Sequence, residues 1–184
     1  MLILIAITGA SGIVIAEKLL RVLKSKNIKT ELIISKSAEV VIASETDSRF
    51  KEIQQLATKY YDVDDLTAPP ASGSHKIDAM IVVPCTMKTL AAIANGYSDN
   101  LITRAADVTL KENRKLILIV RESPLSAIHL ENMLTLARLG VIIAPPVPSY
   151  YIKPKSVDEL VNHTVGRILD QIGIESGIKR WGDG

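Results

Sequence analysis

The stretch that decides the fold is ILIAITGASG, residues 3–12. An unbroken apolar run of this length is typical of a parallel strand that is covered on both faces. Gly9 and Gly12 allow a sharp turn and a close approach of the backbone to a ligand, and the apolar pattern from Ile13 to about Leu23 predicts a helix. Because the free N–H groups of a new helix would face this turn, we expect it to bind phosphate. A tight turn that holds no ligand is the alternative.

Length and composition predict one domain over residues 1–184 that forms oligomers. Hydrophobic residues make up 47% of the chain, which favours an apolar surface buried between subunits. The net charge of +2 is spread over a mixed sequence, which argues against a nucleic-acid partner. Cys85 is the one cysteine, so neither a disulfide framework nor a multi-cysteine metal site is expected. The N-terminal apolar run is too short to span a membrane and lacks a signal-peptide layout, so we expect a cytoplasmic protein.

Strand and helix patterns alternate along the chain. Further strands are expected at residues 31–34, 78–83, 116–120 and 141–144. Helices are expected from a Ser37 cap to 43, at 90–94, at 101–112, from a Ser123 cap with Pro124 to about 139, and at 157–172. Residues 44–65 are polar and weakly helical, 66–74 form a loop, and 175–184 form a polar C-terminal tail. This order predicts an α/β fold, a single doubly wound Rossmann-like (flavodoxin-like) domain whose mostly parallel sheet has helices on both faces.

Polar side chains follow each predicted strand. They are Ser11, Ser35, Thr86 with Lys88 and Thr89, and Arg121 with Glu122. Since the carboxyl ends of parallel strands share one edge, we expect these groups to meet in one crevice. Small hydroxyls, backbone N–H groups and one arginine suit a phosphate and the polar edge of a flat heterocycle. No His/Asp/Glu cluster has metal-ligand spacing, so no metal is expected.

Other candidates have ordinary structural explanations beside the functional one. Arg104 and Lys111 lie on one face of a predicted helix, where Asp107 could pair with both in a solvated ion-pair helix. Glu122 is either a proton donor or an exposed carboxylate. Tyr151 and Arg167 are of types that often lie at surfaces or interfaces. The three histidines form no recognisable triad and are interpreted as structural.

A set of ordered motifs resembles a known family, the UbiX (Pad) flavin prenyltransferases, formerly described as aromatic-acid decarboxylases. The resemblance runs from about residue 3 to 182, although residues 50–65 match nothing in it. The motifs are TGASG at 8–12, APPASGS at 68–74, PCTMKTL at 84–90, RAADVTLKE at 104–112, RESPL at 121–125, IHLENM at 128–133 and RWG at 180–182.

The resemblance implies a reaction in which a dimethylallyl group passes from dimethylallyl phosphate to reduced FMN, at N5 and then C6, without a metal. The product, prenylated FMN, would serve UbiD-type decarboxylases, and the family assembles as a dodecamer with sites between subunits. By similarity, the FMN-binding residues are Gly9, Ala10, Ser11, Ser35, Thr86, Met87, Lys88, Thr89 and Arg121. The residues around the prenyl phosphate are Arg104, Lys111, Glu122, Tyr151 and Arg167, with Glu45 and Ser72 as further candidates. The catalytic residues among these are Ser11, Glu122, Lys111 and Arg104.

One departure and three alternatives accompany this prediction. Many family members carry Trp before the Ala-Pro-Pro loop, where this chain has Leu66, so the rate of the reaction and the preference for a prenyl donor are open. The choice between the mono- and the diphosphate as donor is also open. A cysteine decarboxylase of the same fold would need an early His, and the first here is His75. A short-chain reductase would need a third glycine where Val14 stands, and Pro154 breaks its Tyr-x-x-x-Lys helix. A flavin carrier without chemistry is the third alternative.

Overall fold

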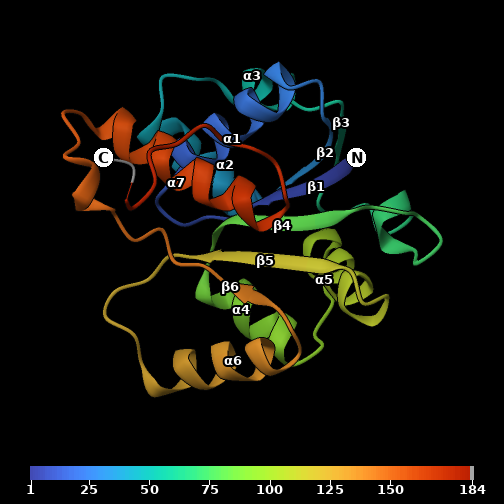
Figure 1. The fold of residues 1–184 in the computed structure, drawn as a ribbon. Coiled ribbons are helices and arrows are strands. Elements are labelled where there is room, and N and C mark those ends of the chain that lie inside the picture. The colour runs from blue at the N-terminus through green and yellow to red at the C-terminus, as the bar shows by residue number, and fades with distance from the viewer. Residues whose placement is uncertain (183–184) are drawn as a thin grey trace.

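The computed structural model describes residues 1–182, which form one six-stranded sheet with the strand order β3-β2-β1-β4-β5-β6 (Figure 1). Every pair of neighbouring strands is parallel. The strands are β1 (Leu2–Ile7), β2 (Lys29–Ile34), β3 (Lys59–Tyr61), β4 (Ala79–Cys85), β5 (Lys115–Val120) and β6 (Ile142–Ile143). The predicted doubly wound sheet is confirmed, and it is parallel throughout these residues.

Helices cover both faces of the sheet because successive strand residues point to opposite sides. Ile3, Ile5 and Ile7 of β1 pack into one core, while Leu4 and Ala6 pack into the other. The first core is closed by α1 (Ile13–Ser25), α2 (Lys36–Glu45), α3 (Phe50–Gln54) and α7 (Val157–Gln171). The second is closed by α4 (Met87–Ala94), α5 (Leu101–Lys111) and α6 (Ala127–Arg138). The two helical layers lie above and below the sheet in Figure 1.

The strand order reverses between β1 and β4, which are neighbours although they lie far apart in sequence. Ligands of such sheets bind outside the strand ends at this switch point. Two hydrogen bonds through Thr8 join the two strand ends. Its hydroxyl donates to the Pro84 carbonyl over 2.7 Å and accepts from the Thr86 N–H over 2.9 Å. These two hydrogen bonds therefore fix the end of β1 against the end of β4.

Two helix starts were predicted at the wrong serine. The cap of α2 is Ser35, whose hydroxyl accepts from the Ala38 N–H, and not Ser37. The cap of α6 is Ser126, whose hydroxyl accepts from the His129 N–H, so Ser123 and Pro124 precede the helix. In both cases several serines or a proline lie within three residues of the true start. Local preference alone does not choose among them.

Further differences concern short elements. The segment 44–65, expected to be weakly helical, contains α3 and also β3, a sixth strand on the sheet edge. β4 continues through Cys85 across a register shift, and α4 begins at Met87 with Thr86 as its cap. No helix in residues 1–182 is long and apolar enough to cross a membrane.

Candidate active site

The turn between β1 and α1 requires glycine at two positions. Gly12 has φ of 108°, a left-handed conformation that residues with a Cβ rarely adopt. At Gly9 an added Cβ would lie 2.4 Å from the Ser37 hydroxyl and 2.9 Å from the Ser37 backbone carbon. Gly9 therefore packs directly against Ser37 in the first turn of α2, and no larger residue fits position 9 without moving one of the two segments.

A carboxylate from α2 lies at the start of α1. Glu45 Oε2 accepts from the Gly12 N–H over 2.8 Å and from the Ile13 N–H over 3.0 Å, and Ser11 also donates to this side chain. The N–H groups expected to bind phosphate are thus already engaged by the chain's own anion. Phosphate binding at this turn stays a prediction.

The ionisation of Glu45 ties three of the site residues together electrostatically. Partial burial opposes the charged form, but hydrogen bonds from Ser11, Gly12 and Ile13 and the charge of Arg121 outweigh it. The pKa of Glu45 is therefore held below its ordinary value. Glu45, a weak candidate in the sequence, is brought together with Ser11 and Arg121, which lie at the ends of two different strands.

The loops after β2 and β4 present small hydroxyls next to helix starts. Ser35 and Ser37 are joined through their hydroxyls over 3.1 Å. Thr86 accepts from the Thr89 N–H and donates to the Thr89 hydroxyl, so both threonines are fixed at the start of α4. The first-turn N–H groups of a helix point outward along its axis, where they attract anions. Met87 and the exposed Lys88 belong to that first turn.

The loop after β5 is exposed over residues 121–126 and brings a cation and an acid to the same edge. The Arg121 N–H donates to the Cys85 carbonyl over 3.1 Å, which ties this loop to the end of β4. Glu122 accepts from the Ser123 N–H over 2.9 Å. We call the loops after β1, β2, β4 and β5 the carboxyl edge. It contains the FMN-binding set expected from the sequence together with Glu122.

Arg104 and Lys111 lie elsewhere, in what we call the α5 cluster. This cluster is the charged face of α5 with Arg114 and the loop 69–75, which includes a short 3-10 helix η1 (Pro69–Ala71). In Figure 1 α5 and the 69–75 loop lie at the opposite end of β4 from the loop after β5. Within one chain, therefore, the structure does not bring Arg104 and Lys111 to the carboxyl edge.

Side chains of the α5 cluster hold the 69–75 loop. Arg104 donates to the Ala71 carbonyl over 3.1 Å and pairs with Asp107 over 2.7 Å. Lys111 pairs with Glu112 over 2.5 Å and not with Asp107, so only half of the ion-pair pattern allowed by the spacing is formed. Arg114 donates to two carbonyls of the loop, those of Gly73 and His75. Ser72 lies between these anchored positions.

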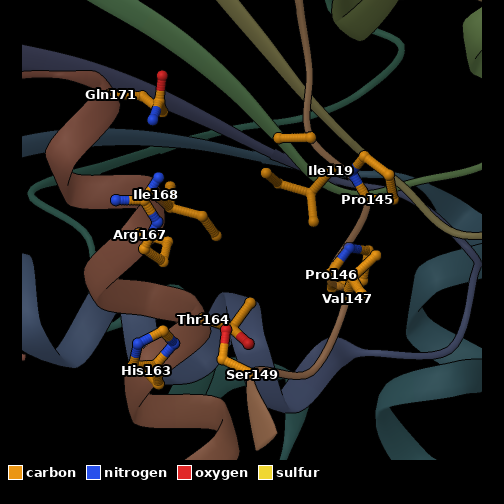
Figure 2. Close-up of a pocket in the computed structure, with 11 residues that line it drawn as sticks. Ile119, Pro145, Pro146, Val147, Ser149, His163, Thr164, Arg167, Ile168 and Gln171 are labelled. Atoms are coloured by element: carbon orange, nitrogen blue, oxygen red, sulfur yellow. The ribbon is translucent and has the colours of Figure 1, made fainter. Parts of the chain in front are cut away.

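Tyr151 and Arg167 lie on the α7 side of the molecule. Tyr151, in the short 3-10 helix η2 (Tyr150–Ile152), shares a 3.0 Å hydrogen bond with His163 of α7. Its ring meets Trp181 edge to face with a centroid separation of 5.2 Å. Figure 2 shows Arg167 and His163 on α7 facing the 145–149 loop across a cavity of about 230 Å³. His163 is buried, and its interpretation as a structural residue stays a prediction.

The donor set suits an organic phosphate. Hydroxyls, helix-start N–H groups and the Arg121 cation gather at the carboxyl edge. These features fit the phosphate and the polar ring edge of FMN. Among residues 1–182, no group of three or more His, Cys, Asp or Glu side chains could hold a metal ion.

The fold and this edge define a flavoprotein of the doubly wound α/β class, and the comparisons agree. The family model described as Flavoprotein matches residues 1–169. Flavin prenyltransferase UbiX of Methanocaldococcus jannaschii is 56% identical over 99% of both chains. The crystal structure of AnUbiX (PadA1) with FMN and dimethylallyl pyrophosphate has a TM-score of 0.98 at 47% identity and covers 100% of this chain and 98% of its own.

A second similar structure is a dodecameric FMN-dependent UbiX-like decarboxylase from Escherichia coli O157:H7, with a TM-score of 0.97 at 46% identity and full coverage of both chains. The chain belongs to the Flavoprotein family and, within it, to the UbiX flavin prenyltransferases. The resemblance drawn from the ordered motifs is therefore confirmed.

Proposed function

We propose that this protein transfers a dimethylallyl group from dimethylallyl phosphate to reduced FMN, forming bonds at N5 and C6. The observation that carries the proposal is the cluster of Ser11, Glu45 and Arg121. It brings a hydroxyl bonded to a carboxylate, which together can accept a proton, and a cation to the carboxyl edge. The relatives support it: the M. jannaschii protein is named a flavin prenyltransferase, and AnUbiX holds FMN together with dimethylallyl pyrophosphate.

The carboxyl edge is the proposed FMN site. The start of α4, with its Thr86 and Thr89 hydroxyls and the Lys88 cation, suits the phosphate. This assignment respects the occupation of the Gly12 and Ile13 N–H groups by Glu45. Reduced FMN supplies the nucleophilic atoms of the reaction. The remaining members of the proposed set are Gly9, Ala10, Ser11, Ser35, Met87 and Arg121.

The chain's own residues would supply cations and proton transfers. Breaking the allylic carbon–oxygen bond develops negative charge on the departing phosphate, and a fixed donor in a dry site is worth about 3 kcal/mol of barrier. In the proposed reaction Glu122 would give that phosphate a proton, and Ser11, which is hydrogen-bonded to Glu45, would pass on the proton released near N5. Tyr151 and Arg167 are the proposed phosphate ligands on the α7 side.

Arg104 and Lys111 reach such a site only from a second copy of the chain. Both lie in the α5 cluster, at the other end of the strands (Figure 1). Ser72 lies in the loop held by Arg104 and Arg114, so it would come to the site with them. The E. coli relative is dodecameric, which supports an assembly of several copies, and the proposal is that the carboxyl edge of one copy meets the α5 cluster of another. The recipient of the product would be a UbiD-type decarboxylase.

The test is anaerobic incubation of the protein with reduced FMN and dimethylallyl monophosphate, without magnesium, followed by mass spectrometry of the flavin. A flavin heavier by one five-carbon prenyl unit is expected, and Glu122→Gln should slow its formation. The diphosphate is tested in parallel, because the choice of donor is open. If FMN stays bound but returns unchanged with both donors, the protein is a flavin carrier and the proposal fails. Release of carbon dioxide from a peptidyl cysteine would instead indicate a cysteine decarboxylase.

A further inference from the structure

Asp170, near the end of α7, receives hydrogen bonds from two arginines at once. Arg180 donates to both carboxylate oxygens, over 2.9 Å each, and Arg167 donates to Oδ2 over 3.0 Å. The Ser176 hydroxyl adds a contact of 3.3 Å to Oδ1. The Asp170 side chain is only 15% exposed, so this sharing takes place in a largely dry setting. Two guanidinium groups therefore bind one carboxylate, Arg180 through two hydrogen bonds and Arg167 through one.

Both arginines line the same cavity as the aromatic pair on the α7 side. This cavity of about 350 Å³ is bounded by Ser149, Tyr151, Arg167 and residues 178–181. Two cations against one carboxylate leave the cluster with one positive charge in excess, which suits an anion. Arg167, whose side chain is 55% exposed and which makes a single contact to Asp170, is the cation better able to turn toward that anion.

The segment 176–182 delivers Arg180 to this place through its own packing. Ile178 lies so close to Gly166 of α7 that a Cβ added there would be 2.2 Å from the Ile178 Cγ2 atom. Glycine inside a helix costs about 1 kcal/mol relative to alanine, so its presence at position 166 has a structural reason. Trp181 adds the edge-to-face contact with Tyr151. Arg180 is thus held against Asp170 by contacts on both sides of it in the sequence.

We propose that Arg180 is a positioning residue that occupies Asp170 and thereby leaves Arg167 available to the prenyl phosphate. This inference rests on the proposed function, since it assigns the phosphate to Arg167. Without Arg180, both carboxylate oxygens would be open to Arg167, which would close onto Asp170 in a two-pronged pair. Its charge would then be neutralised, and the phosphate would be bound more weakly.

The experiment measures binding of dimethylallyl monophosphate by calorimetry to the full protein loaded with oxidised FMN, in which no transfer takes place. Arg180→Gln should weaken binding about fivefold, the size of a partly exposed charge contact. Adding Asp170→Asn to Arg180→Gln should restore binding, because the group that captures Arg167 has lost its charge. Arg21→Gln, which breaks an ion pair with Glu17 on α1, is the matched control and should bind as the wild type does.

The outcomes separate this inference from the proposed function. A wild type that binds no dimethylallyl phosphate contradicts the proposed function itself. If the wild type binds dimethylallyl phosphate and Arg180→Gln binds it equally well, the proposed role of Arg180 is wrong. The role is also wrong if the double variant binds more weakly than Arg180→Gln. Gly166→Ala should disturb the contact between Arg180 and Asp170 without removing a charge, because its Cβ would displace Ile178. It should weaken binding in the same way, and unchanged binding would overturn the inference even if Arg180→Gln did not fold.

Discussion

The carboxyl edge and the α5 cluster hold their charged groups in different ways. At the carboxyl edge, Glu45 is fixed by backbone N–H groups of Gly12 and Ile13, and Gly9 packs against Ser37 of α2 with no room for a side chain. In the α5 cluster, Arg104 and Lys111 are long side chains, each paired with an acidic neighbour on the same helix or just beyond it. The turn at residues 9–13 is thus constrained by backbone contacts, while the α5 cluster can re-pair its cations when a new anion arrives.

This difference between backbone contacts and side-chain ion pairs shows how one chain can offer two kinds of surface for building a site. Backbone-defined contacts suit the part that must orient a flat ring to fractions of an ångström. Exchangeable ion pairs would suit a part that meets a leaving phosphate, because the acidic partners would keep the cations ordered until a phosphate replaced them. If the two regions face each other across a subunit boundary, neither should work alone.

The largest expected effect comes from separating the two regions on different chains. Lys111→Ala and Ser11→Ala should each lower formation of prenylated FMN by about a hundredfold, as expected for loss of one group acting on developing charge. Co-expression of the two variants should recover a substantial part of the activity, since some interfaces then pair an intact carboxyl edge with an intact α5 cluster.

The flavin is followed by mass spectrometry in the mixed and in the separate preparations. As the control, two carboxyl-edge variants, Ser11→Ala and Glu122→Gln, are co-expressed and should recover less. Equal recovery in both mixtures would contradict the assignment of Lys111 to a second subunit.

A smaller effect is expected on the free energy of unfolding, where a glycine-to-alanine substitution should cost more at the carboxyl edge than in the α5 cluster. Gly9→Ala should lower the free energy of unfolding by about 2 kcal/mol and weaken FMN binding, because the new Cβ meets the Ser37 backbone. Gly73→Ala in the α5 cluster meets the Glu112 carboxylate at a similar 2.4 Å, yet that group is the end of a flexible side chain and can move. Its cost should stay below about 1 kcal/mol. Urea unfolding and FMN fluorescence titration measure both, and equal costs would remove the contrast between rigid and adaptable regions.

The smallest effect should appear in the pH dependence of stability. The pKa of Glu45 is lowered in the folded chain, so its ionised form stabilises the fold at any pH above its ordinary value of 4.5. This contribution should be lost as the pH falls from 4.5 through the lower folded pKa. Since Glu45 is well exposed, the difference in unfolding free energy from Glu45→Gln should be about 1 kcal/mol or less at pH 7.

Urea unfolding of the wild type and of Glu45→Gln at pH 7, 5.5, 4.5 and 3.5 checks this expectation. The gap between the two proteins should be constant at the two higher pH values and should narrow at the lowest. A gap that widens on acidification would contradict the contacts seen at Gly12 and Ile13. Glu39→Gln, an exposed residue of the same helix, is the control and should show a smaller gap.

The sheet and its carboxyl edge could be predicted from the sequence because both follow from local patterns. Apolar runs fixed the central strands, and the rule for parallel strands placed Ser11, Ser35, Thr86 and Arg121 on one edge. The edge strand β3 was missed because Lys59, Tyr60 and Tyr61 form no buried apolar run.

Other parts depended on packing between distant segments. Glu45 reaches the N-terminus of α1 only because α2 lies against that helix, a contact over 33 residues without a local signal. The spacing of Arg104 and Lys111 was read correctly as one helix face, but spacing carries no information on which subunit a face meets. The shared Asp170 likewise joins two segments whose residues show no common motif.

Cys85 ends β4 directly beneath the carboxyl edge, and its thiol is fully buried. Burial raises its pKa to about 12, so the thiolate is scarcely populated at neutral pH. A reduced flavin exposed to oxygen generates hydrogen peroxide, which attacks thiolates and spares thiols. With FMN bound at the proposed site, the one sulfhydryl of the chain would lie near a redox-active ring in a form that resists oxidation, and the protein should tolerate repeated exposure to air without sulfenic acid formation at this position.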